Sequence, residues 1–259
     1  MLPVIDNPIK TNNNVVCFKI LEKNKIECYK TYNINKKHCN KVAGVSSEVY
    51  PFTTEEEIKL MIDLLNNRIN NSSDEDKKQI AYRNKMMFVI GINVGLRASD
   101  LITLKWNFFF NNDGTFKDFY ILQPKKTKKQ KKFIKLFFNQ TVKKVINDYI
   151  EEYPIKDMDD YLFKSRKGNK HITEISLGRI IKTTAYEVGI KKNICSHSLR
   201  KTWGYFVWHK AEDKGKALVI LQQCFNHSDS LTTMKYIGIM DEEKKEMYES
   251  IDLGLDCLW

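Results

Sequence analysis

A histidine and a tyrosine stand nine positions apart in the polar segment NHSDSLTTMKYI, residues 226–237. A tyrosine with its ordinary pKa near 10 is a poor nucleophile unless positive groups lower the cost of forming its anion. His227 and Tyr236 could therefore take part in attack on a phosphorus atom if further cations lie beside them. Taken alone, the segment also fits, and more simply, a capped helix start with a half-buried Tyr236.

An arginine and an aspartate stand in the segment GLRASDL, residues 95–101, between the end of an apolar helix and the start of the next. Backbone N–H groups at a helix terminus favour an anion, which suits Arg97 as a phosphate ligand. Asp100 lies one turn further on, where its carboxylate could hold the guanidinium in place. A surface ion pair beside the helix end is the alternative interpretation.

A second arginine follows a histidine by three positions in HSLR, residues 197–200. Residues three apart lie on the same face of a helical turn. His197 and Arg200 would repel one another unless an anion lies between them, and a phosphate would serve. The alternative is that His197 caps the helix and Arg200 is solvated.

Lysines dominate the segment KKTKKQKK, residues 125–132, which contains no acidic residue. Such a run is usually a solvated basic face, and it can bind a nucleic-acid backbone. One lysine at the tip of a ribbon could also reach into the minor groove and donate a proton to a leaving oxygen, and Lys126 is the candidate. The expected backbone contacts are Lys125, Lys128, Lys129, Lys131 and Lys132.

Composition supports a polyanion as the partner. The 259 residues include 43 Lys and Arg against 32 Asp and Glu, a net charge of +11, which favours nucleic acid first and an anionic membrane second. The longest apolar stretch, residues 86–96, is too short to span a bilayer, and the N-terminus lacks the order of a secretory signal. The six cysteines show no spacing suited to zinc, so we expect no metal site and no cofactor.

The hydrophobic pattern predicts a mainly α fold with small β-sheets (α+β) in two parts. Residues 1–50 form a short N-terminal segment, with a β-hairpin in 14–31 turning at 22–25 and a linker at 32–50. Residues 51–259 form the main domain. Its first helix starts with a cap at Thr53 or Thr54 and a glutamate at position 56 or 57.

Further elements of the main domain follow from periodicity and breakers. Residues 66–78 are predicted to be a loop, and 119–138 a two-stranded ribbon with a basic turn. Gly95 suits the left-handed end of a helix. Helices are predicted at 80–94, 140–152, 174–189, 198–210, 216–224 and 231–250.

Taken in order, GLRASDL, the lysine ribbon, HSLR, and His227 with Tyr236, the chain resembles the tyrosine recombinase (phage integrase) family over roughly residues 52–250. The resemblance implies a mainly helical catalytic domain that cuts one DNA strand at a time. In that reaction Tyr236 would form a 3′-phosphotyrosyl bond and release a 5′-hydroxyl, and the step would then reverse on a partner strand.

The resemblance also implies a role for each matching residue. Arg97 and Arg200 would clamp the non-bridging phosphate oxygens, and His227 would add a hydrogen bond. His197 would act as general base toward Tyr236. Lys126 would be the general acid for the 5′-oxygen, with Lys125 and Lys128 as alternatives, and Asp100 would support the arginine site.

Three features depart from the family pattern. The usual Leu-Gly-His triplet is Phe225-Asn226-His227 here, and the interval from Arg200 to His227 is longer than expected. Members normally carry a helical DNA-binding domain of about a hundred residues before the catalytic domain, so the short segment before Pro51 could be a reduced DNA-binding region.

The expected function is site-specific DNA recombination for a phage or other mobile element, in the cytoplasm of a bacterial host. The expected partners are double-stranded DNA, a tetramer on two duplexes and an accessory directionality factor, with no membrane. The apolar end, residues 253–259, could pack on a neighbouring subunit or fold back on its own. The alternatives are a non-catalytic DNA-binding regulator on the same fold and a type IB topoisomerase.

Overall fold

The computed structural model describes residues 9–11, 15–17, 48–125, 133–166 and 168–251. The chain divides into two compact units, Met1–Ser46 and Ser47–Trp259. In the first unit, β1 (Ile9–Thr11) and β2 (Val15–Cys17) pair in antiparallel fashion. The turn predicted at 22–25, nearly all of the predicted linker and the apolar end at 253–259 lie outside the described residues.

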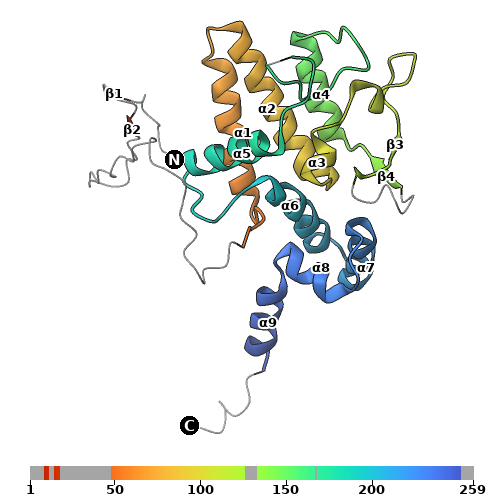
Figure 1. The fold of residues 1–259 in the computed structure, drawn as a ribbon. Helices are drawn as coiled ribbons and strands as arrows, with labels where there is room; N and C mark the ends of the chain where they lie inside the picture. The colour runs from red at the N-terminus through yellow and green to blue at the C-terminus, as the bar shows by residue number, and fades with distance from the viewer. Residues whose placement is uncertain (1–8, 12–14, 18–47, 126–132, 167, 252–259) are drawn as a thin grey trace. The chain divides into compact units, whose positions relative to one another are not determined.

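The second unit is mainly helical with a small two-stranded sheet, which confirms the predicted fold class (Figure 1). No helix within the described ranges combines the length and apolar character needed to cross a membrane. The elements described in this unit are α1 (Glu55–Asn70), α2 (Glu75–Val94), α3 (Ala98–Leu101), the short 3-10 helix η1 (Trp106–Phe108), β3 (Phe119–Leu122), β4 (Ile134–Phe137), α4 (Gln140–Glu152), α5 (Glu174–Glu187), α6 (Ser196–His209), α7 (Lys214–Phe225), α8 (Ser230–Ile237) and α9 (Met240–Glu249).

Helix α2 forms the centre of the main core. It packs against α1, α4 and α6, and its residues from Met86 to Ile90 are all buried. Side chains on every side of this part of the helix are therefore covered, as expected for a helix that is apolar all round. Helix α2 ends at Gly95, two residues before Arg97. The buried position of α2 therefore fixes the place at which the segment carrying Arg97 begins.

A smaller apolar cluster joins α6, α7 and α8. Leu221, Phe225 and Ile237 are almost fully buried in it. Gly204 permits the close approach of the helices, because a Cβ atom there would lie 2.7 Å from side-chain atoms of both Ile237 and Phe225. This cluster holds the helix that carries Arg200 against the helices that flank the His227 segment.

The ribbon predicted at 119–138 is present as the antiparallel pair β3 and β4. Phe119 lies opposite Phe137, and Leu122 lies opposite Ile134. The basic turn that connects the strands, residues 126–132, lies outside the described residues. The described residues on either side of this segment are Lys125 and Phe133.

The predicted cap of α1 is confirmed. Thr54 Oγ1 accepts a hydrogen bond from the backbone N of Glu57 at 3.2 Å, and Glu57 Oε2 accepts one from the backbone N of Thr53 at 2.9 Å. These two bonds satisfy backbone donors at the start of the helix and just before it.

Two predicted boundaries were wrong. The loop expected at 66–78 spans only 71–74, because burial of Leu65 and Ile69 continues α1 to Asn70 and Asp74 caps α2 by accepting from Lys77 N at 3.0 Å. The single helix expected at 231–250 is two helices, α8 and α9, because Gly238 adopts φ 84° between them. Left-handed geometry of this kind ends a helix.

Candidate active site

Arg97 is placed by the sharp end of α2. Gly95 closes that helix with φ 62°, and a Cβ atom there would come within 2.2 Å of the Trp203 ring. The backbone at Gly95 therefore packs directly against the Trp203 ring. Arg97 is the residue immediately before α3. Its Nη2 donates to the carbonyl oxygen of Phe225 at 3.2 Å, which ties the start of α3 to the end of α7.

Arg200 is buried in α6, with 4% of its surface exposed. Its Nη1 donates to the carbonyl oxygen of Gly95 and its Nη2 to that of Cys224. Its guanidinium carbon lies 4.4 Å from the centroid of the Phe225 ring. The alternative that Arg200 is solvated is therefore wrong.

The positive charge of the two arginines is not offset by a contacting carboxylate in the part of the chain that is described. Burial lowers the pKa of the Arg200 guanidinium to about 10, the Tyr236 phenol opposes this shift, and the charge of Arg97 adds to it. Burial of a cation favours an anionic partner. Arg97 and Arg200 thus carry positive charge without a contacting carboxylate among the described residues, an arrangement that attracts an anion.

His227 follows a left-handed residue, Asn226, at φ 57°. Its Nδ1 lies 3.1 Å from Thr233 Oγ1, and its backbone N donates to the carbonyl of Gln222 at 3.0 Å. Burial lowers the pKa of His227, and the charges of Arg200 and Arg97 lower it further. The imidazole therefore binds its proton less readily than an ordinary histidine, and it lies beside the two arginines.

Tyr236 lies on α8 beside the same groups. Its ring centroid is 5.1 Å from that of His227 and 5.1 Å from that of Phe225, with edge-to-face geometry in both cases. Burial raises the pKa of the Tyr236 phenol, whereas the charges of Arg200 and Arg97 lower it. The arginines thus favour the phenolate, which is the more nucleophilic form of a tyrosine.

His197 is exposed in the first turn of α6. The residue that caps this helix is Cys195, whose Sγ accepts from His197 N at 3.4 Å while Ser198 Oγ accepts from Cys195 N at 3.0 Å. The alternative in which His197 caps the helix is therefore wrong. His197 lies one turn before Arg200, as its spacing predicted.

Asp100 is almost fully buried, with 2% of its surface exposed. Its Oδ1 accepts from the backbone N of Lys125 at 3.0 Å, so the described contact of this carboxylate is with the base of the lysine ribbon. Asp100 thereby holds Lys125, the residue before the basic turn, against the helix that follows Arg97. Of the predicted lysines, Lys125 is described and exposed, and Lys126, Lys128, Lys129, Lys131 and Lys132 lie outside the described residues.

Sequence reasoning missed the role of Phe225, which it treated as a departure from the family triplet. Its ring contacts the guanidinium of Arg200, the ring of His227 and the ring of Tyr236, and its carbonyl accepts from Arg97. No motif could have identified the carbonyl acceptors at Gly95, Cys224 and Phe225, because a backbone oxygen leaves no signal in residue type.

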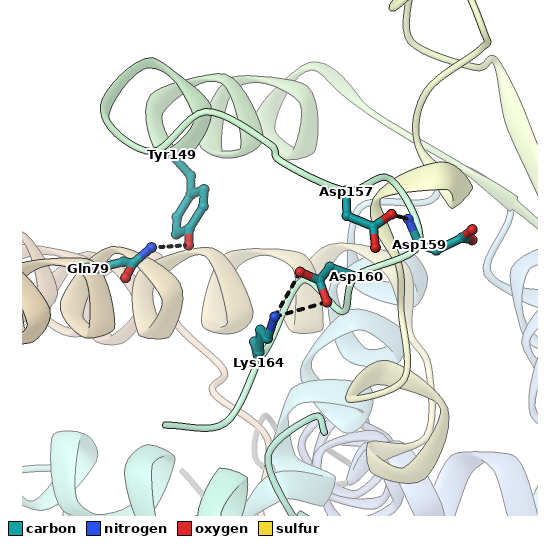
Figure 2. Close-up of polar contacts among 6 residues, drawn as sticks. All are labelled: Gln79, Tyr149, Asp157, Asp159, Asp160 and Lys164. Atoms are coloured by element: carbon teal, nitrogen blue, oxygen red, sulfur yellow. Dashed lines mark hydrogen bonds and ion pairs between the residues drawn. The ribbon is translucent and has the colours of Figure 1, made fainter. Parts of the chain in front are cut away.

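A hollow of about 280 Å³ lies elsewhere, between α2, the end of α4 and residues 154–166. Figure 2 shows two pairs among its polar side chains: Gln79 donates to Tyr149, and Lys164 contacts both carboxylate oxygens of Asp160. None of the described catalytic candidates lines it. The hollow is therefore separate from the arginine site.

The fold and the site define a helical protein that brings two arginines, a histidine and a tyrosine close together. Residues 51–243 match the Phage integrase family. The chain is 34% identical over 180 residues to Probable integrase/recombinase YoeC of Bacillus subtilis (strain 168), a match that covers 68% of this chain and 90% of that protein. The chain therefore belongs to the phage integrase family, and the resemblance to tyrosine recombinases is confirmed.

Other relatives are longer. The chain is 26% identical over 210 residues to Tyrosine recombinase XerH of Campylobacter jejuni, covering 80% of this chain and 53% of that protein. Its fold is similar to those of XerA recombinase (TM-score 0.55, 19% identity, 81% of this chain and 66% of that one) and of XerH bound to its difH substrate in a pre-cleavage complex (TM-score 0.53, 19% identity, 86% and 57%). The chain thus spans about half of XerH.

Proposed function

We propose that this protein is a site-specific DNA recombinase that cleaves and rejoins strands through a 3′-phosphotyrosyl intermediate. The observation that supports this most directly is the convergence of Arg97, Arg200, His227 and Tyr236 from four separate segments on one partly buried, positively charged site. The named relatives include recombinases, and one of the similar structures holds a DNA substrate.

In the proposed reaction the phenol oxygen of Tyr236 attacks the phosphorus of one strand. A Tyr236–phosphorus bond forms, the bond to the 5′-oxygen breaks, and that oxygen leaves as a hydroxyl after gaining a proton. Arg97 and Arg200 bind the non-bridging oxygens and stabilise the charge that develops on them. The reverse reaction, with the 5′-hydroxyl of a partner strand as nucleophile, rejoins the DNA.

Proton transfer is assigned to residues at the edge of this site. His197 is exposed at the start of α6 and would accept the proton of Tyr236. His227 would donate a hydrogen bond to the phosphate. Lys126 would protonate the 5′-oxygen. In support of this role, Lys125, the residue before it, donates its backbone N–H to Asp100, which lies three positions after Arg97.

The proposed partner is double-stranded DNA, in keeping with the net charge of +11. We further propose a tetramer on two duplexes, an accessory directionality factor and action on a phage or mobile element in a bacterial cytoplasm. Exposed apolar side chains near the C-terminal end of the described chain, Met247, Tyr248 and Ile251, support contacts between subunits.

Covalent trapping tests the proposal. The protein is incubated with nicked duplexes that cover the ends and target of its parent element, and a denaturing gel is examined for a protein–DNA adduct. We expect an adduct that disappears in Tyr236→Phe, while Tyr248→Phe, in which another phenol is removed, retains it. Tight, salt-dependent binding without any adduct would instead favour the non-catalytic regulator. Relaxation of a supercoiled plasmid without a partner duplex would favour the topoisomerase.

A further inference from the structure

Lys201 is a buried cation beside the proposed nucleophile, and the mechanism above leaves it without a role. It directly follows Arg200 in α6, and only 9% of its surface is exposed. Within the described part of the chain its ammonium makes no ion pair and no hydrogen bond. Its Nζ lies 5.3 Å from the centroid of the Tyr236 ring.

A buried ammonium without a contacting carboxylate is unfavourable for stability. Burial accordingly lowers the pKa of Lys201, while Glu48, from the segment before α1, and Cys195, at the start of α6, oppose that shift. Other charged groups near the ring of Tyr236 are Arg200, Arg97 and His227. Perturbed groups of this kind concentrate at functional sites.

The contacts of Tyr236 show what Lys201 can do. His227 and Phe225 each meet the Tyr236 ring edge-to-face, and α8, which carries the ring, is a helix of eight residues ending at Gly238. Lys201 adds a contact from α6, the helix that also carries Arg200. A cation held over an aromatic ring is attracted by the ring and, more strongly, by its phenolate form.

We propose that Lys201 is a positioning residue for the nucleophile: its ammonium holds the ring of Tyr236 in the orientation for attack and favours its phenolate. This inference rests on the proposed function of Tyr236. In this role Lys201 acts on the tyrosine and makes no contact with the phosphate, so its removal should slow cleavage without weakening DNA binding.

Two substitutions and a matched control test the proposal. Lys201→Met removes the charge and keeps much of the volume, so we expect it to fold. Lys201→Arg keeps the charge. Lys210→Met is the control, because Lys210 lies at the other end of α6 and its Nζ also lies over an aromatic ring, that of Phe206, at 5.5 Å.

The first measurement does not depend on activity. Tyr236 is replaced by 3-fluorotyrosine, whose phenol titrates at lower pH, and the ¹⁹F resonance is followed against pH. We expect Lys201→Met to raise the pKa of this phenol and to shift its resonance, and Lys201→Arg and Lys210→Met to leave the pKa close to that of the parent. No change in Lys201→Met would overturn the inference.

The second measurement is single-turnover cleavage of a nicked duplex. We expect Lys201→Met to slow cleavage about tenfold, with recovery at higher pH and in Lys201→Arg, at unchanged DNA affinity. A loss explained by weaker DNA binding would make Lys201 a phosphate contact and overturn the positioning role. If the parent protein does not cleave DNA but the phenol pKa shifts as expected, the proposed function fails and the coupling of Lys201 to Tyr236 stands.

Discussion

The guanidinium of Arg200 donates a hydrogen bond to the carbonyl oxygen of Gly95. This bond joins the middle of α6 to the residue that ends α2, across 105 positions of sequence. The same arginine also reaches the carbonyl of Cys224 at the end of α7. One buried side chain thus fixes the segments that carry Arg97, His227 and Tyr236.

Arg200→Lys should impair both stability and cleavage. A lysine has one ammonium and cannot reach the carbonyls of Gly95 and Cys224 as the planar guanidinium does. We expect a loss of about 1–3 kcal/mol in the free energy of unfolding, because a buried acceptor is left without its donor, and a loss of at least about 100-fold in single-turnover cleavage. Urea unfolding and adduct formation measure the two effects, and a variant with parental cleavage would contradict the assignment.

Gly95→Ala should destabilise the fold far more than Gly114→Ala. Both glycines have positive φ, at 62° and 81°, but a Cβ atom at Gly95 would collide with the Trp203 ring, whereas none would be met within 4 Å at Gly114. We expect a loss of about 3 kcal/mol or more for Gly95→Ala and about 1 kcal/mol for Gly114→Ala. Equal losses of unfolding free energy in the two variants, measured by urea unfolding, would show that the Trp203 ring does not exclude a side chain at position 95.

His227 should make the protein less stable in mild acid. Its pKa is lowered by burial and by the two arginines from the ordinary value of 6.5. The unfolded state therefore binds the proton more readily, so the free energy of unfolding falls as the pH drops below that value. We expect the free energy of unfolding of His227→Gln to fall less than that of the parent between about pH 7 and pH 5, because the variant lacks this group. Identical pH slopes for the two proteins, measured by urea unfolding, would refute the assignment.

Asp100→Ala should loosen the base of the lysine ribbon. The carboxylate accepts the hydrogen bond of Lys125 N at 3.0 Å, and alanine removes that acceptor while asparagine keeps an oxygen in place. We expect faster hydrogen exchange at the amide of Lys125 and slower cleavage in Asp100→Ala, with smaller effects in Asp100→Asn. Unchanged exchange at Lys125 in Asp100→Ala would mean that the ribbon is held by other contacts.

Lys126→Ala should be rescued by a better leaving group. If Lys126 protonates the 5′-oxygen, a substrate with a 5′-thio leaving group needs no proton, and cleavage by the variant should approach that of the parent. Lys132→Ala, at the other end of the basic run, serves as the control for loss of charge and should show no rescue. Equal loss by Lys126→Ala on both substrates would move the acid to Lys125 or Lys128.

Local signals were sufficient for most elements. The capping pair of Thr54 and Glu57, the left-handed Gly95 and the ribbon on either side of the lysines were predicted from neighbouring residues, because such features depend on contacts within a few positions of sequence. The predictions that were wrong, at 66–78 and at 231–250, concern helix ends. There the burial of Ile69 or the conformation of Gly238 decided the boundary, and neither is visible in hydrophobic spacing.

The sequence by itself determined the types and order of the chemical groups, Arg97, His197, Arg200, His227 and Tyr236, because each lies in a short motif. Only the tertiary structure decided how they act together. Arg200, in α6, contacts the carbonyl of Gly95 at the end of α2, and the carbonyl of Cys224 and the ring of Phe225 at the end of α7. These contacts join three separate segments. The ammonium of Lys201 reaches Tyr236 from a different helix. Such contacts arise from packing of buried helices, which places residues side by side without regard to their separation in sequence.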